Sequence, residues 1–338
     1  MIFPGDVANR GLPYSTRFCE AGIDSRQMHV TPLWCTFRNR PAGRGIRLAF
    51  GKLHGVHNST YSTAKSTVSQ ETGESMHIGE GEHLLSVTRW PGAGPTVLLI
   101  HGIGASGDSW RDLIPALGQH FTPVTMDLRG HGESGKPASG YLYDDYVNDL
   151  DRVLDGLGED APLLIGHSLG GIVALWWAAR HPSRARAIVV VDSPLRSGED
   201  FRPAFDGWIA QNAMSPADLT AWYLEKNPEW SEQRAARRAR IMTGTAPHVF
   251  IELRADSLAH HGADRIAELT GITTPVLLVH GDVETGGMVH PDDLAAFQAR
   301  MPNASTARIP EAGHALHRDR TDEFLSRAMP FLREHSRK

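Results

Sequence analysis

Continuous apolar runs, separated by amphipathic segments, constrain the fold of this chain more than any other feature. The runs 97–100 (Val-Leu-Leu-Ile) and 188–191 (Ile-Val-Val-Val) contain only aliphatic residues. Strands of this kind are typical of a parallel sheet that is covered on both faces. On this pattern we expect strands at residues 83–90, 96–101, 122–127, 163–167, 187–192, 276–280 and 305–309.

Helical patterns fill the stretches between these runs. We expect helices at residues 110–120, 143–157, 172–181, 291–301 and 321–334. The alternation of strand and helix favours an α/β fold with a doubly wound, mostly parallel sheet.

The alternation is interrupted between residues 194 and 270, where no strand-like run occurs and aromatic residues cluster. One segment there begins with Ser215-Pro216, an N-cap followed by proline at the first helical position. We interpret residues 194–270 as a helical cap inserted into a core formed by residues 76–193 and 271–338.

The first 75 residues show neither helical nor strand periodicity, so we expect a disordered N-terminal lead. Because Met76 opens the first regular segment, the lead is also a candidate over-long gene model, which N-terminal sequencing of the native protein would test. The lead is net basic and the rest of the chain is net acidic, and the formal net charge of the whole chain is −5 at pH 7. An acidic body disfavours nucleic acid as a ligand.

Several other classes of protein are disfavoured. The chain has no run of about 18 apolar residues, so we expect no membrane span. It lacks a signal-peptide pattern, and its two cysteines, Cys19 and Cys35, cannot form a disulfide framework, which favours the cytoplasm. His260, His261 and His290 lack metal-ligand spacing, so we expect neither metal nor cofactor. The oligomeric state is left open.

The most informative motif is Gly166-His167-Ser168-Leu169-Gly170, which joins an apolar run to a helical pattern. A Gly-x-Ser-x-Gly sequence at a strand-to-helix turn is the pattern of a nucleophile elbow, in which a strained turn exposes the serine hydroxyl. The motif predicts Ser168 as a nucleophile. The alternative is a helix-capping serine on a glycine-rich turn.

A serine hydroxyl needs a base that is oriented by a carboxylate. Among the 18 histidines, His314 follows the last expected strand and precedes the last helix, so it lies where an α/β sheet presents its chemistry. We therefore predict His314 as the base. His101 and His167 flank glycines in two loops and are interpreted as structural hydrogen-bonding residues.

Three carboxylates are candidates for the acid. Asp282 and Glu284 lie in the loop after the expected strand 276–280, and Asp192 ends the strand before it. The oxyanion of an acyl-transfer reaction needs backbone N–H donors. We expect one from Leu169, at the start of a helix, and the other from Ile103, between Gly102 and Gly104.

From Met76 onward the chain resembles the α/β-hydrolase fold family, in its serine-nucleophile branch with a helical cap. The elbow carries the resemblance, together with 101–104 (His-Gly-Ile-Gly), 127–134 (Asp-Leu-Arg-Gly-His-Gly-Glu-Ser) and Gly313-His314. The resemblance implies that Ser168, His314, Ile103 and Leu169 have the roles given above. It places the acid at Glu284, where the family commonly has aspartate, so Glu284 is preferred to Asp282 and Asp192 is the third choice.

The reaction implied is acyl transfer to Ser168, and we expect hydrolysis of a carboxylic ester. Thioesterase, lactonase, carbon–carbon bond hydrolase and haloperoxidase-like activities share the same triad and are alternatives. There are two non-enzymatic alternatives. The protein could be a ligand-binding receptor, or it could have a regulatory or scaffold role that depends on the basic lead. The serine argues against relatives with an aspartate nucleophile, namely epoxide hydrolases and haloalkane dehalogenases. The acidic body and the aromatic-rich cap together suggest a small, largely apolar substrate that is neutral or cationic.

Overall fold

The computed structural model describes residues 72–196, 201–260, 265–269 and 271–336. The first 71 residues, and with them most of the expected lead and both cysteines, lie outside the described residues. The described strands are β1 (Glu74–Ile78), β2 (Leu85–Arg89), β3 (Thr96–Ile100), β4 (Thr122–Met126), β5 (Leu163–His167), β6 (Ala187–Val191), β7 (Val276–His280) and β8 (Ala304–Arg308).

These strands form one eight-stranded sheet in the order β1-β2-β4-β3-β5-β6-β7-β8. Pairing is parallel from β4 through β3 to β8, whereas β2 runs antiparallel to both β4 and β1. The predicted doubly wound, mostly parallel sheet is therefore confirmed. Strand β5, which leads into the elbow, lies between β3 and β6 with Leu164 opposite Leu98 and Ile188.

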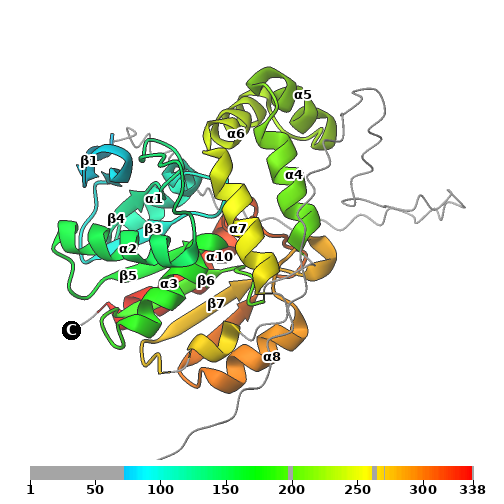
Figure 1. Cartoon of the computed structure of the whole chain (residues 1–338). Helices are drawn as coiled ribbons and strands as arrows, with labels where there is room; N and C mark the ends of the chain where they lie inside the picture. Colours follow the sequence, from blue (N-terminus) through cyan, green and yellow to red (C-terminus); the bar gives the residue numbers. More distant parts are fainter. Residues whose placement is uncertain (1–71, 197–200, 261–264, 270, 337–338) are drawn as a thin grey trace, which may run out of the picture. The chain divides into compact units, whose positions relative to one another are not determined.

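Helices cover both faces of the sheet (Figure 1). The helices of the core are α1 (Ile114–Gly118), α2 (Tyr143–Leu157), α3 (Leu169–Arg180), α8 (Pro291–Arg300), α9 (Leu316–Asp319) and α10 (Thr321–His335). Helices α2, α3 and α8 pack on one face, and α1, α9 and α10 pack on the other. Successive strand residues serve opposite faces, so Leu164 joins the first layer while Leu163 and Ile165 join the second.

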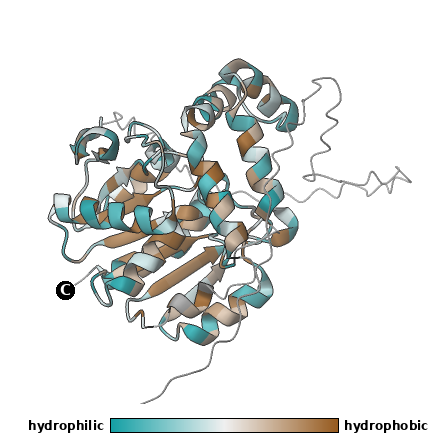
Figure 2. Ribbon diagram, viewed as in Figure 1, coloured by the Kyte–Doolittle hydropathy of each residue, from teal (hydrophilic) through white to brown (hydrophobic). Residues whose placement is uncertain are grey.

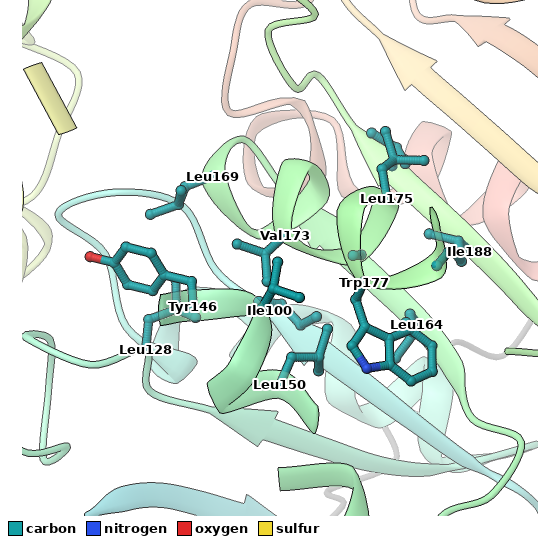
Figure 3. Close-up of a cluster of buried hydrophobic side chains, with 14 of the residues drawn as sticks. Ile100, Leu128, Tyr146, Leu150, Leu164, Leu169, Val173, Leu175, Trp177 and Ile188 are labelled. Carbon is teal, nitrogen blue, oxygen red and sulfur yellow. The ribbon is translucent and has the colours of Figure 1, made fainter. Parts of the chain in front are cut away.

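The core explains why the apolar runs are continuous. All five residues of β3, of β5 and of β6 are buried, and these strands are hydrophobic along most of their length in Figure 2. Figure 3 shows Leu164 and Ile188 of the sheet in one buried cluster with Val173 and Trp177 of α3. Complete burial of each such side chain stabilises the fold by about 1.5–3 kcal/mol.

Helices also occupy the segment that we interpret as a cap. Between β6 and β7 lie α4 (Arg202–Asn212), α5 (Pro216–Lys226), α6 (Glu232–Gly244), α7 (Pro247–Ala259) and the 3₁₀ helix η4 (Arg265–Leu269). Ser215 caps α5 as its sequence predicts, because its side chain accepts a hydrogen bond from the N–H of Asp218 at 3.1 Å. The cap has its own buried cluster, to which Leu219, Met242 and Phe250 belong.

The structure differs from the expected elements in three places. Strand β1 was not predicted, and it begins at Glu74, before Met76; its residues alternate in polarity and lie at the sheet edge. The expected helix 110–120 is divided into the 3₁₀ helix η2 (Gly107–Leu113) and α1. Helix α3 begins at Leu169, because Gly170 and Gly171 are part of its first turn. Among the described residues, no helix combines the length and the apolar character that crossing a membrane requires.

Candidate active site

Ser168 lies on a sharp turn between β5 and α3. Its backbone has φ 53° and ψ −118°, a conformation that L-residues with a side chain rarely adopt. The two glycines of the motif make the turn possible. A Cβ on Gly166 would lie 2.4 Å from the carbonyl oxygen of Gly170, and a Cβ on Gly170 would lie 2.2 Å from that of Ile100. Strand and helix therefore approach too closely for any larger residue, as expected for a nucleophile elbow.

The loop after β3 lies directly against this turn. A Cβ built on Gly102 would be 3.0 Å from Cβ of Ser168, so Gly102 and Ile103 border the serine. The backbone N–H of Leu169 is at the first turn of α3, where helix N–H groups have no intrahelical partner (Figure 3 shows Leu169). Two segments that carry the expected oxyanion donors thus converge on Ser168.

His314 is held between a carboxylate and a second imidazole. Its Nδ1 lies 2.8 Å from Oδ2 of Asp192, and because a carboxylate accepts, Nδ1 is assigned as the donor, which makes Nε2 the acceptor nitrogen of the neutral ring. The carbonyl of His314 accepts a hydrogen bond from Nε2 of His167 at 2.9 Å, and the two rings are 4.6 Å apart between centroids. Because His167 precedes Ser168, this bond ties the loop of the expected base to the elbow.

Asp192 is fully buried at the end of β6, and it is one of few non-glycine residues with positive φ, at 43°. Its carboxylate also accepts hydrogen bonds from the N–H of Gly281 at 3.1 Å and of Met288 at 2.9 Å. A buried carboxylate needs such partners because an unpaired charge is costly away from water. The three donors fix the position of the carboxylate beside the imidazole.

The structure therefore corrects the preferred acid. Glu284 is exposed on the 3₁₀ turn η5 (Val283–Thr285) and has no contact with His314. The runner-up, Asp282, pairs instead with Arg308 of β8 at 2.8 Å and accepts the N–H of Glu311 at 2.9 Å. The hydrogen bond from Arg308, reinforced by that N–H, lowers the pKa of Asp282 to about 2. Neither side chain forms a hydrogen bond or ion pair with His314 among the described residues, and the carboxylate that does is that of the third choice, Asp192.

Two further histidines near the site are kept neutral by burial. Burial lowers the pKa of His167 well below its usual range, and the charges of neighbouring His317, His314 and Arg318 add to the effect. Burial likewise lowers the pKa of His317, whose ring stacks on those of His167 at 4.4 Å and Trp110 at 4.5 Å. Neither ring nitrogen of His317 has a hydrogen-bond partner among the described residues.

A family model described as the alpha/beta hydrolase fold matches residues 95–321, which is more than half of the chain. The chain belongs to the alpha/beta hydrolase fold family. Its relatives include a 2-(acetamidomethylene)succinate hydrolase from Mesorhizobium japonicum, 27% identical over 248 residues and covering 71% of this chain and 88% of the relative. An N-formylmaleamate deformylase from Pseudomonas putida is 27% identical over 252 residues, which are 72% of this chain and 91% of the relative.

A solved structure supports the same assignment. The crystal structure of E-2-(acetamidomethylene)succinate hydrolase matches this alpha/beta hydrolase with a TM-score of 0.64 and 26% identity, over 77% of this chain and 99% of that one. With relatives that are named hydrolases and an assembled site, this chain is an enzyme of the hydrolase class.

A cavity of about 1150 Å³ lies elsewhere on this alpha/beta hydrolase. Residues of β2, η2 and α6 line it, among them Thr88, Asp108 and Arg237, and neither Ser168 nor His314 takes part. We place the candidate site at Ser168, His314 and Asp192, because the segments that carry these three side chains come together there. The described residues that line the large cavity lack this arrangement of a nucleophile, a base and a carboxylate.

The sequence placed Asp192 third among the acids, although it is the carboxylate that contacts His314. It did not indicate that His317 and Arg238 lie near the site. The available signal for Asp192 was its place directly after a fully aliphatic run, at the same sheet edge as Ser168. His317 and the cap residue Arg238 gave no comparable signal, since Arg238 reaches the loop of Gly104 only through the folded cap. In the part of the chain that the structure describes, no cluster of three or more His, Cys, Asp or Glu side chains is arranged for a metal.

Proposed function

We propose that this hydrolase cleaves a carboxylic ester or a related acyl bond through an acyl-serine intermediate on Ser168. The observation that carries the proposal is the hydrogen-bonded pair of Asp192 and His314, linked by the His167 bond to the elbow of Ser168. A carboxylate behind Nδ1 orients the imidazole and stabilises the imidazolium form that appears during the reaction.

The proposed reaction begins with attack of Ser168 Oγ on the substrate carbonyl carbon, while Nε2 of His314 takes the hydroxyl proton. The resulting oxyanion accepts hydrogen bonds from the backbone N–H groups of Ile103 and Leu169. His314 then passes its proton to the leaving group, and the acyl-enzyme forms. Water, activated by the same imidazole, cleaves that ester and restores Ser168.

Amide-type acyl bonds are a second candidate for the scissile bond, because one relative is named a deformylase of an N-formyl compound and another a hydrolase of an acetamido compound. Both bond types pass through the same tetrahedral intermediate, and the protonation of a nitrogen leaving group by His314 is the more demanding step. A panel of p-nitrophenyl acetate, a thioester, a lactone and an N-formyl amide distinguishes these activities.

An active-site-directed fluorophosphonate tests the nucleophile directly. We expect the full-length protein to be labelled with one equivalent, located on Ser168 by mass spectrometry, and the Ser168→Ala variant to be unlabelled. Ser106→Ala is the matched control, because Ser106 is also buried near the site yet its hydroxyl makes no hydrogen bond among the described residues. Absence of labelling in the wild-type protein, or labelling that survives in Ser168→Ala, would refute the proposal.

A further inference from the structure

Two arginines beside the candidate site form no ion pair with a carboxylate of the described residues. Helix α6 of the cap carries several arginines, and two of them pair with carboxylates of the core: Arg234 with Asp319 at 2.9 Å and Arg237 with Asp108 at 3.2 Å. Arg238, the residue after Arg237 on this helix, forms no ion pair with any described residue. It donates instead to the carbonyl oxygen of Gly104, in the expected oxyanion loop.

Arg318 is the second of these arginines. It belongs to α9, the short helix that starts directly after the loop of His314. Its side chain is partly exposed, yet its Nε is enclosed and has no hydrogen-bond partner, and no carboxylate of the described residues lies within ion-pair distance. An enclosed guanidinium N–H without an acceptor is unfavourable by roughly the cost of a lost hydrogen bond to a charged group.

The two guanidinium groups converge on one side of the site. Arg238 lies over the ring of Tyr223 with its Cζ 5.9 Å from the ring centroid, and the pKa of that tyrosine is raised by burial while the charges of Arg238 and Arg318 oppose the rise. Burial, followed by the like charge of Arg238, lowers the pKa of Arg318 to about 10. Asp319 and Asp112 act on Arg318 only from beyond ion-pair distance, so two neighbouring cations without a carboxylate in direct contact among the described residues favour the binding of an anion.

We infer that Arg238 and Arg318 form a carboxylate-binding subsite next to the oxyanion loop, and that the substrates are acyl compounds bearing a second, unreacting carboxylate. The planar guanidinium forks suit a carboxylate geometrically. The contact of Arg238 with Gly104 sets the distance between this carboxylate and the carbonyl that Ser168 attacks. The inference rests on the proposed acyl hydrolysis, and it replaces the apolar substrate expected from the aromatic residues of the cap.

The relatives are consistent with this substrate class. Both enzymes reported above are named for substrates derived from dicarboxylic acids, a succinate and a maleamate. The subsite is assigned on the arginines of this chain and not on those names.

The test compares two esters of equal shape and different charge: monoethyl succinate, and ethyl 4-oxopentanoate, in which a methyl group replaces the carboxylate oxygen. Acid release by the full-length protein is followed by pH-stat titration. We expect kcat/KM to favour the succinate, and Arg318→Met or Arg238→Met to reduce that preference about 10-fold to 100-fold. Arg240→Met is the control, because Arg240 is exposed on α6 and forms no ion pair among the described residues. It should leave the preference unchanged.

A binding measurement separates the subsite from the reaction. The Ser168→Ala protein should bind monoethyl succinate in isothermal titration, and the added Arg318→Met substitution should abolish the binding. Equal kcat/KM for the two esters, or a preference for the succinate that neither arginine variant changes, would overturn the subsite and leave the acyl hydrolysis standing. Binding of the succinate by Ser168→Ala without hydrolysis of either ester by the wild type would support the subsite and count against the proposed reaction.

Discussion

The backbone N–H of Gly104 donates a hydrogen bond of 3.1 Å to Nε2 of His131, which ties the loop after β3 to the turn after β4. The other ring nitrogen of His131, Nδ1, donates to the carbonyl of Arg129 at 2.9 Å, so both nitrogens of the buried imidazole form hydrogen bonds. Only the neutral ring can accept from Gly104, and burial, with a contribution from His101, lowers the pKa of His131 to about 3. The position of Ile103, next to Gly104, therefore depends on a neutral histidine.

Replacing His131 by phenylalanine should leave the Gly104 N–H without a partner. We expect a loss of about 1–3 kcal/mol in the free energy of unfolding, measured by urea denaturation. We also expect kcat to fall between about 10-fold and 100-fold with little change in KM, because a shift of the oxyanion loop acts on the transition state. His131→Gln, whose amide oxygen can accept the bond, should recover part of kcat, and the exposed His77 serves as the control site with His77→Phe. Wild-type kcat in His131→Phe would contradict this positioning role.

Stability should fall on mild acidification. Burial lowers the pKa of His101 to about 4 and that of His131 to about 3, whereas in the unfolded chain both are near 6.5. As the pH falls below 6.5, the unfolded state binds protons that the folded state does not. Each histidine therefore makes its full contribution to the free energy of unfolding above pH 6.5. As the pH falls from 6.5 towards the pKa of the folded state, this contribution decreases by about 1.4 kcal/mol per pH unit.

Urea unfolding at pH 7.5, 6.0 and 5.0 measures this dependence. The carboxylate of Asp282, whose pKa the hydrogen bond from Arg308 lowers to about 2, takes up its proton only at a pH below this interval. His101→Gln should reduce the slope between pH 6.5 and 5, whereas the exposed His77→Gln should not. A stability that is flat over this interval would show that the buried rings take up protons in the folded state.

The acid of the triad is tested by three carboxylate variants. Asp192→Asn should lower kcat on an activated ester by about 10⁴-fold, because His314 then loses the acceptor that fixes its tautomer. Glu284→Gln, at the exposed position that the sequence favoured, should keep kcat. Asp282→Asn should weaken the link to Arg308, and its effect should appear as a small loss of stability. A full loss of kcat in Glu284→Gln, with activity retained in Asp192→Asn, would show that Glu284 and not Asp192 is the acid.

The sequence predicted the sheet well because its central strands are covered on both faces and so read as unbroken aliphatic runs. It missed β1, a five-residue edge strand where Glu74 and His77 are exposed and only Met76 and Ile78 pack, partly buried, against the core. It could not decide the acid, because the ends of β6 and β7 meet at the same edge of the sheet. The choice depends on side-chain partners, namely Arg308 for Asp282 and His314 for Asp192, that come from distant parts of the chain.

The unpaired arginines were beyond sequence reasoning for a related physical reason. Arg238 and Arg318 are far apart in the chain, and each lies among other basic residues that do find carboxylates. A basic helix such as α6 usually has a solvated face. Only the packing of the cap on the core separates the arginines that form ion pairs from those that do not.

The close approach at the elbow can be tested by two Gly→Ala substitutions with opposite expected signs. An alanine at position 170 would place its methyl group 2.2 Å from the carbonyl oxygen of Ile100 and 2.7 Å from that of His101, so strand and helix must separate. We expect Gly170→Ala to lower the free energy of unfolding by about 1–3 kcal/mol and to reduce fluorophosphonate labelling of Ser168. Gly207 lies within α4 with open space around its Cβ position, so Gly207→Ala should raise the free energy of unfolding by about 0.5–1 kcal/mol and leave the labelling rate unchanged. A Gly170→Ala protein as stable and as reactive as the wild type would show that the turn can adjust to a methyl group.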